Sequence, residues 1–396
     1  MKRAAPEALR FLYFHPVRLP DAEANVVQTA ETCRALAEAG HEVFLIVPRL
    51  MGASPADCLE TLGLVPHERL HLVEEPAIRL KNSSGLGSVW VRLGLFFFLR
   101  SLVRRGRTVI YFRTLKDSRL VRFLLLASRL LRVPVIYEAH KLYLDKRQEA
   151  GFHVQSLARV QRLERRAITR ASAIVASHPL LERTIRDRFP DSRPMTTIQN
   201  GVNPVTVKPG AARYDLVYAG SLFPWKGVDI CLEALARLEG RTLAVVGGNP
   251  AERLEALKER ARELGLEERI HFFGQLPRGR VFEIVAFSRI ALIPLAAGHV
   301  EGDRYTCPLK MLEAMQLGVP VLAADTPALR SFIDDGENAL LYPAGDVDAL
   351  AERIDRLLRD QDLAARLSAN ARRLAAEFSY LVRARKVAEL ARSLIG

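Results

Sequence analysis

A lysine and a glutamate three residues apart, Lys310 and Glu313, form the most specific chemical pair in the chain. Thr306 can cap a helix, Pro308 suits its first position, and Gly318 can end it before an apolar run. Residues three apart share a helix face, and the first turn offers unpaired N–H groups and a positive dipole end. The spacing therefore predicts a cation for an anionic phosphate beside a carboxylate for a hydroxyl. A surface ion pair without a ligand is the alternative.

The same segment resembles a known enzyme family. The letters Y-T-C-P-L-K-M-L-E-A-M, followed by G-V-P-V, resemble the donor-binding helix of the family-4 retaining glycosyltransferases, which have the GT-B fold. The resemblance implies that Glu313 binds the ribose hydroxyls of a nucleoside diphosphate sugar. It also implies that Thr306, Leu309 and Lys310 hold the phosphates at the helix start. Tyr305 stands where the family usually has another Glu, which touches the donor sugar, so the identity of that sugar stays open.

A second basic position follows the first expected strand of the C-terminal half. The letters G-S-L-F-P-W-K-G, residues 220–227, resemble the family's G-R-L-x-x-x-K-G, in which Arg and Lys hold the diphosphate. The resemblance implies that Lys226 offsets charge on the leaving diphosphate, while Ser221 replaces the Arg. Gly247 follows the next strand, where a glycine turn allows close approach of a nucleotide. A solvated lysine and an ordinary glycine turn are the alternatives.

Polar residues also end two expected strands of the N-terminal half. V-I-Y-F runs into Arg113, and V-I-Y runs into Glu138 and His140. These strand ends resemble the Y-x-R and E-x-H of the same family branch, where the His faces the donor sugar or the acceptor. Open α/β sheets bind ligands at this edge. The resemblance implies an acceptor-side site here, with His140 as a catalytic residue beside Lys226 and Glu313. A structural cap for His140, and a salt bridge between Glu138 and Arg113, are the alternatives.

Strands alternating with helical patterns position these residues. The expected strands of the first half are residues 11–14, 43–47, 108–112, 135–137 and 173–176. Those of the second half are residues 216–218, 243–246, 270–273, 290–293, 319–323 and 339–341. This alternation predicts an α/β protein whose parallel sheets carry helices on both faces. Two Rossmann-like domains in tandem, facing across a cleft as in GT-B proteins, are expected.

A turn-rich connection separates the two halves. The letters I-Q-N-G-V-N-P-V-T-V-K-P, residues 198–209, resemble the family's N-G-V-D hinge. We expect an acceptor-side domain at residues 1–205 and a nucleotide-sugar-binding domain at residues 206–377. The tail from residue 347 has a helical pattern that breaks near residue 379. The resemblance implies that residues 378–396 cross back and pack on the N-terminal domain.

Composition limits the partners of the chain. Its net charge is +13, and residues 1–205 hold 32 Lys and Arg against 19 Asp and Glu, while the remainder holds 26 of each. No aromatic interleaving, zinc-finger spacing or RNP-like strand accompanies this charge, so nucleic acid is not an expected partner. The four cysteines lack C-x-x-C spacing, which predicts neither a zinc site nor a disulfide framework and fits the cytoplasm. No apolar run approaches the roughly 18 residues of a membrane span.

One helical segment, residues 88–103, has an apolar stripe with basic edges. Such a stripe is what a helix lying in a membrane interface needs, so it predicts peripheral docking on an anionic inner membrane face. Phe96 and Phe98 widen the apolar surface and suit the alternative, an ordinary core-facing helix. The stripe comprises Trp90, Leu93, Phe97 and Leu102, and the basic residues are Arg92, Arg100, Arg104 and Arg105.

The predicted function is a retaining transfer of sugar from a nucleoside diphosphate sugar to a hydroxyl acceptor. A lipid-linked or surface-glycan acceptor would fit docking on a membrane. The resemblance implies front-face attack in which the leaving phosphate takes the acceptor proton, so no protein base, cofactor or metal is expected. No D-x-D element is evident in a donor loop. A sugar-nucleotide epimerase of GT-B fold and a non-catalytic nucleotide-sugar-binding protein are the alternatives.

Overall fold

The chain folds into two compact units. They comprise Met1–Gly201 with Tyr380–Gly396, and Val202–Ser379. The division falls in the turn-rich connection identified from the sequence. The computed structural model describes residues 7–16, 18–19, 24–50, 54–75, 86–103, 107–113, 115, 118–145, 154–205, 207, 210–296, 298, 304–306 and 309–395.

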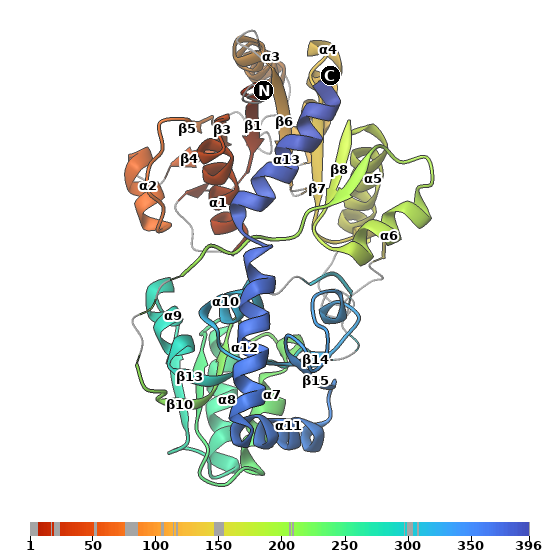
Figure 1. The fold of residues 1–396 in the computed structure, drawn as a ribbon. Coiled ribbons are helices and arrows are strands. Elements are labelled where there is room, and N and C mark those ends of the chain that lie inside the picture. The colour runs from red at the N-terminus through yellow and green to blue at the C-terminus, as the bar shows by residue number, and fades with distance from the viewer. Residues whose placement is uncertain are drawn as a thin grey trace. The chain divides into compact units, whose positions relative to one another are not determined.

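The first unit contains a seven-stranded parallel sheet in the order β5-β3-β1-β6-β7-β8-β9 (Figure 1). Its strands are β1 (Arg10–Phe14), β3 (Glu42–Val47), β5 (Leu70–Glu74), β6 (Thr108–Phe112), β7 (Val135–Ala139), β8 (Ala173–Ala176) and β9 (Met195–Thr197). Its helices are α1 (Ala24–Glu38), α2 (Pro55–Thr61), α3 (Leu86–Val103), α4 (Ser118–Leu131), α5 (Val154–Arg170), α6 (Pro179–Arg188) and α13 (Tyr380–Ile395). A short pair, β2 (Arg18–Leu19) and β4 (Arg49–Leu50), and the 3-10 turn η3 (Tyr143–Asp145) complete this unit.

Central strands of this sheet are apolar because helices cover both faces. Every residue of β6, β7 and β8 is buried, as expected for parallel strands inside an α/β layer. The five strands expected from the sequence are present. Two others, β5 and β9, were not expected, because the L-H-L-V-E and M-T-T of these strands are not continuous apolar runs.

The last helix completes the core of the first unit. Helix α13 packs against α1, and Figure 1 shows the two side by side, in blue and dark red. One stripe of α13 is buried in the same hydrophobic cluster as α1 and the sheet, comprising Tyr380, Ala384, Val387, Ala388 and Ala391. Positions separated by three or four residues form one helix face, so the amphipathic pattern explains this packing.

Helix α3 divides its apolar residues between two sides. Leu95 and Leu99 are buried, whereas Leu93 and Phe97 are exposed, and Phe97 keeps 63% of its surface accessible. The core-facing residues are therefore not those of the stripe read from the sequence. Of that stripe and its basic edges, the side chains of Trp90 and Arg92 and the residues 104–105 lie outside the described part. Among the described residues, no helix combines the length and apolar character needed to cross a bilayer.

The second unit contains a six-stranded parallel sheet in the order β12-β11-β10-β13-β14-β15. Its strands are β10 (Tyr214–Ala219), β11 (Leu243–Val246), β12 (Ile270–Gly274), β13 (Ser288–Ile293), β14 (Val321–Asp325) and β15 (Leu340–Pro343). Its α-helices are α7 (Val228–Ala236), α8 (Ala251–Glu263), α9 (Arg278–Ala286), α10 (Leu309–Leu317), α11 (Val347–Arg359) and α12 (Gln361–Ala376). Two 3-10 turns, η4 (Pro224–Lys226) and η6 (Leu329–Ser331), lie between them.

The helix expected around Lys310 is α10, and it ends as the sequence predicts. Gly318 adopts φ +75°, the left-handed conformation that terminates helices. The next strand begins at Val321 rather than at the expected Val319, because the N–H of Val319 donates to the carbonyl of Ala314 and still belongs to the helix end. Pro308 lies outside the described residues. Two Rossmann-like sheets and a C-terminal helix on the first unit confirm the predicted fold class.

Candidate functional site

The strand order of the second unit reverses between β10 and β13, where open α/β sheets bind ligands. The loops that leave these two strands touch each other there. The N–H of Ala296 donates to the carbonyl of Trp225 at 3.0 Å. Gly227 has φ +70°, and a Cβ at this position would lie 1.8 Å from the carbonyl oxygen of Pro294. Only glycine therefore allows this close approach, which fixes the loop that carries Lys226.

Lys226 ends η4 at this edge of the sheet. Its ammonium lies 3.9 Å from the ring centre of Trp225, within the range of a cation–π contact. Burial lowers the pKa of Lys226 from 10.5 to about 8. A partly desolvated cation interacts more strongly with an anion than one in water. Lys226 is thus suited to an anionic group such as a diphosphate.

Glu313 stands between two cations. Its side chain is 8% exposed, the ammonium of Lys310 lies 3.0 Å from Oε2, and the NH2 nitrogen of Arg278 lies 3.3 Å from Oε1. The contact with Lys310 lacks the alignment of a hydrogen bond, so Oε2 accepts none from the described residues. Because Oε2 accepts no hydrogen bond from these residues, it can accept hydrogen bonds from a hydroxyl-bearing ligand.

The other residues expected to contact the donor lie on the same unit. The carbonyl of Ser221 accepts a hydrogen bond from the hydroxyl of Tyr218 at 2.5 Å. A Cβ on Gly247 would lie 1.9 Å from the carbonyl oxygen of Gly220, so this glycine allows two strand-end loops to meet. Thr306, Leu309 and Lys310 are half-buried, whereas Tyr305 is buried, at 4% exposure.

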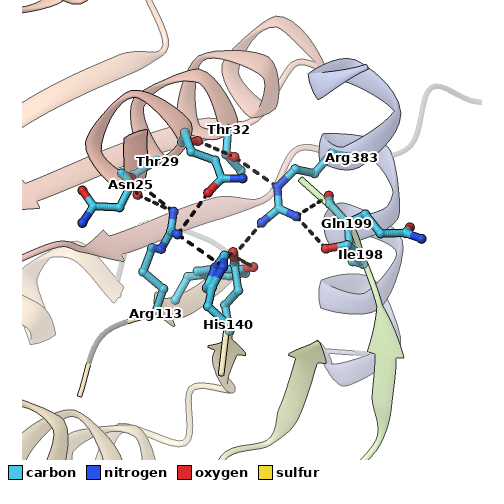
Figure 2. Close-up of polar contacts among 11 residues, drawn as sticks. Asn25, Thr29, Thr32, Arg113, His140, Ile198, Gln199 and Arg383 are labelled. Carbon is cyan, nitrogen blue, oxygen red and sulfur yellow. Dashed lines mark hydrogen bonds and ion pairs between the residues drawn. The ribbon is translucent and has the colours of Figure 1, made fainter. Parts of the chain in front are cut away.

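In the first unit the strand order reverses between β1 and β6, and the expected acceptor-side residues meet near this point (Figure 2). Nε2 of His140 lies 2.5 Å from Oε1 of Glu138, and Nδ1 lies 3.5 Å from the NH2 nitrogen of Arg113. Arg113 also donates to the side chains of Thr29 at 3.1 Å and Gln28 at 3.0 Å on α1. The structure therefore brings together all three residues predicted from the two strand ends.

The charge states of Glu138 and His140 follow from their burial and from the charges beside them. Burial alone would raise the pKa of the Glu138 carboxyl, but the charge of Arg383 and the contact with His140 hold it well below its ordinary value. Burial and the charge of Arg113 lower the pKa of His140 from 6.5 to about 4, although Glu138 opposes this shift. At neutral pH Glu138 is ionised and His140 is neutral.

Two arginines of these clusters were not predicted from the sequence. Arg278 follows β12 and begins α9, and a basic residue just after a strand end is a signal that could have identified it. Arg383 forms an ion pair with Glu138, at 2.7 Å, whereas the sequence suggests Arg113 as the partner of Glu138. No local pattern marks Arg383, because its partners lie far away in the chain. Among the described residues, no group of three or more His, Cys, Asp or Glu side chains is arranged to hold a metal ion.

Two family models match the sequence. The model described as "Glycosyltransferase Family 4" matches residues 26–205, and "Glycosyl transferases group 1" matches residues 207–374. The first range contains the cluster of Arg113, Glu138 and His140. The second contains Lys226 and Glu313. All five of these residues therefore lie inside the matched regions.

Curated proteins are also similar to this chain. A D-inositol 3-phosphate glycosyltransferase of Frankia alni is 34% identical over 183 residues, which cover 43% of this chain and 43% of the relative. A GDP-mannose-dependent alpha-(1-6)-phosphatidylinositol monomannoside mannosyltransferase of Mycolicibacterium smegmatis is 29% identical over 180 residues, covering 44% of this chain and 47% of the relative. The chain thus spans about half the length of the curated relatives it matches.

A solved structure supports the fold over the whole chain. HepE of Anabaena, in complex with UDP, matches with a TM-score of 0.70 and 20% identity, covering 98% of this chain and 100% of that one. Its likeness concerns the arrangement of the elements, since the identity is low. The two family models show that the chain belongs to glycosyltransferase family 4, and the two Rossmann-like units together with the likeness to HepE show that it has the GT-B fold.

Proposed function

We propose that this chain transfers a sugar from a nucleoside diphosphate sugar to a hydroxyl acceptor with retention of the anomeric configuration. The observation that carries the proposal is Glu313, a nearly buried carboxylate held by two cations, with one oxygen that accepts no hydrogen bond from the described residues. A ribose offers adjacent hydroxyls that can donate to such an oxygen. Lys226, at the same sheet edge, supplies a cation for the diphosphate.

In the proposed reaction the acceptor oxygen bonds to the anomeric carbon while the bond from that carbon to the diphosphate oxygen breaks. Attack occurs on the face that the diphosphate leaves, and the leaving phosphate takes the acceptor proton. Lys226 and the amides at the start of α10 stabilise the negative charge that grows on the diphosphate. Residues 202–379 bind the donor, and the cluster of Arg113, Glu138 and His140 serves the acceptor side.

A panel of UDP-, GDP- and ADP-sugars tests this reaction, because nucleotide release can be followed with and without hydroxyl acceptors. A transferase releases nucleotide and yields a glycosylated acceptor. An epimerase would convert the donor sugar without transferring it, and a binding protein would leave the donor intact. The complex of HepE with UDP and the GDP-mannose dependence of the mycobacterial relative make these two nucleotides the first to test. Because protein cations serve the diphosphate, turnover is expected to persist in EDTA.

The ribose role of Glu313 has its own test. In Glu313→Gln one acceptor oxygen becomes an NH₂ group, and Arg278 and Lys310 lose their anionic partner. We expect the donor KM to rise about 10-fold or more, which corresponds to ~1.4 kcal/mol. Glu283→Gln is the matched control, since Glu283 is exposed and pairs with Arg280 on the surface of α9. An unchanged KM in Glu313→Gln would mean that this carboxylate does not bind ribose.

We also propose that the first unit docks on an anionic membrane surface, which would favour a lipid-linked acceptor. Seven large apolar side chains of the described residues are exposed, and four of them lie on α3 and α4, which contact each other. These four are Leu93, Phe97, Leu126 and Leu130. Exposed arginines accompany them, namely Arg100, Arg122 and Arg129. Apolar side chains with basic neighbours suit the interface of an anionic bilayer, where each basic residue adds about 1 kcal/mol.

Co-sedimentation with vesicles of increasing phosphatidylglycerol content tests the docking. Binding is expected to increase with the anionic fraction and to weaken in ~0.5 M salt, where the Debye length falls to a few Å. Phe97→Glu should reduce binding, because it removes an apolar contact and adds repulsion. Val65→Glu, at an equally exposed apolar residue between α2 and β5, is the control. Binding that ignores lipid charge, or no binding, would point to a soluble acceptor.

A further inference from the structure

The last helix supplies a buried cation to the acceptor-side cluster (Figure 2). Arg383 on α13 is 3% exposed, and its NH2 nitrogen lies 2.7 Å from Oε2 of Glu138. Its Nε donates to the hydroxyl of Thr32 on α1 at 3.1 Å. Its NH1 donates to the carbonyls of Ile198 and Gln199, at 2.8 Å each. The guanidinium is therefore held by α1, by the connection after β9 and by the end of β7.

The charge of Glu138 needs a counter-ion, because its carboxylate is fully buried. Among the described residues, two groups that touch this carboxylate can carry a positive charge, Arg383 and His140, whereas the hydroxyl of Tyr111 donates a hydrogen bond to Oε2 without a positive charge. Arginine is always charged in proteins, so Arg383 neutralises the carboxylate while His140 stays neutral. The charge of Arg113, on the other side of the imidazole, also opposes a proton on His140. Without Arg383, a proton on His140 would provide the missing positive charge.

The ionised carboxylate also fixes the tautomer of His140. A carboxylate only accepts hydrogen bonds, so Nε2, which faces Oε1 of Glu138, carries the imidazole hydrogen. Nδ1 then has a lone pair. The NH2 nitrogen of Arg113 lies 3.5 Å from it, at the outer limit of a hydrogen bond, and the side chain of His140 is 24% exposed. Nδ1 is thus a weakly engaged acceptor at the ligand-binding edge of the sheet.

We propose that Arg383 is a positioning residue for substrate binding: as the counter-ion of Glu138, it leaves His140 neutral, with an Nδ1 lone pair that accepts a hydrogen bond from a sugar hydroxyl. The low pKa of His140 agrees with this charge state. That the ligand is a sugar rests on the proposed function, whereas the charge state of His140 does not. Lysine at position 383 would keep the charge, and methionine would remove it while filling much of the same space.

Nitrogen NMR of the full chain with ¹⁵N-labelled histidine tests the proposal without any substrate. The signals of His140 are identified by their loss in His140→Gln. At pH 7 the wild-type protein is expected to show hydrogen on Nε2 and a lone pair on Nδ1. Arg383→Lys should keep this state, and Arg383→Met should convert His140 to the form with hydrogen on both nitrogens. Arg385→Met, at an exposed residue of the same helix, is the matched control and should leave His140 unchanged.

A double variant keeps the test decisive when Arg383→Met does not fold. In Arg383→Met with Glu138→Gln the buried charge and its counter-ion are removed together, which avoids an uncompensated ion. The double variant is expected to fold and to show a neutral His140 again. A wild-type His140 with hydrogen on Nδ1, a folded Arg383→Met with unchanged imidazole signals, or a double variant with protonated His140 would each overturn the proposal.

The substrate half of the proposal is tested by adding UDP-glucose and GDP-mannose separately, each with and without the hydroxyl acceptors of the panel. A hydroxyl that donates to Nδ1 should shift its nitrogen resonance in the wild type and not in Arg383→Met. Turnover without such a shift would overturn this half while leaving the proposed function intact. No turnover with any donor would refute the proposed function, whereas the charge state of His140 would still stand.

Discussion

Arg278, at the first position of α9, and Glu313, on α10, form an ion pair in which the NH2 nitrogen lies 3.3 Å from Oε1. The guanidinium of Arg278 also lies 5.1 Å from the ring centre of Phe282. This arrangement orients a nearly buried carboxylate from one side and leaves its second oxygen toward Lys310. The two helices follow different strands, β12 and β13, so the pair links two separate strand–helix connections of one sheet.

Arg278→Ala is expected to raise the Kd of the nucleotide about 10-fold with little change in kcat. A hydrogen bond to a charged group contributes about 1.5–3 kcal/mol, and part of this is lost when Glu313 can change its orientation. Isothermal titration with UDP and GDP measures the effect. Arg280→Ala is the matched control, because Arg280 lies two residues further on α9 and pairs with Glu283 at the surface. Equal affinities in both variants would show that Arg278 does not orient Glu313.

Lys226→Ala should reduce kcat about 100-fold or more while changing donor affinity far less. The charge on the diphosphate is greatest in the transition state, so a cation at the leaving group acts mainly on turnover. A unit charge pair at 4 Å is worth about 4 kcal/mol at an effective dielectric of 20, which exceeds the ~2.7 kcal/mol that corresponds to 100-fold. Unchanged kcat in steady-state assays would remove Lys226 from the reaction.

The pH dependence of kcat/KM provides an independent check on Lys226. Burial lowers the pKa of Lys226 to about 8, so in the free protein its ammonium group is mainly charged below pH 8 and mainly neutral above it. We therefore expect kcat/KM to be constant from pH ~6.5 to ~7.5 and to fall above pH 8, because kcat/KM reports the ionisation of the free enzyme. In Lys226→Arg the decline should disappear, since arginine stays charged. A decline that persists in this variant would belong to another group.

Gly227→Ala should destabilise the second unit more than Gly240→Ala. Both glycines have positive φ, +70° and +64°, so alanine costs about 1 kcal/mol at either position. Only at Gly227 would the new Cβ meet a neighbour, the carbonyl oxygen of Pro294, so about 1–3 kcal/mol more is expected. Thermal unfolding measures both, and activity should fall only in Gly227→Ala, which displaces Lys226. Similar Tm losses would show that the loop contact is not needed.

Stability should fall on acidification below pH 6.5, partly through His140. Its pKa is about 4 in the folded chain and 6.5 ordinarily, so between these values the unfolded chain binds the extra proton. The contribution of His140 to the free energy of unfolding is fully present above pH 6.5 and is lost as the pH falls toward 4. The shift in the pKa of His140 corresponds to about 3 kcal/mol. Glu138, with its lowered pKa, extends the loss to more acidic pH.

Urea unfolding of the wild type and His140→Gln between pH 7.5 and 4.5 measures this share. The variant should show a shallower dependence on pH, whatever its absolute stability at pH 7.5. His41, whose pKa is also lowered to about 4 by burial and the charges of Arg392 and Arg69, remains in both proteins. If the free energy of unfolding depends on pH in the same way in both proteins, His140 has the same pKa in the folded and unfolded chains.

The sequence could predict what depends on local patterns. Fully buried strands such as β6 and β8 are continuous apolar runs in the sequence. Helix α10 ends at Gly318, whose positive φ is typical of a glycine that terminates a helix. The positions of Lys226 and Glu313 come from short motifs that resemble those of the family. Edge strand β5 was missed, because an edge needs no continuous apolar run and tolerates His71. Arg383 could not be found, since its partner Thr32 is 351 residues away and nothing near Arg383 indicates the contact.

The packing of α13 on α1 also determines the order in which the protein can be completed during synthesis. Residues 202–379 are contiguous, so the second unit can finish folding as soon as its own residues have left the ribosome. The first unit cannot, because the apolar face that receives Val387, Ala388 and Ala391 stays uncovered until α13 emerges. A nascent chain therefore carries an open core in the first unit until α13 has been made, and of the two units the one that is begun first is completed second.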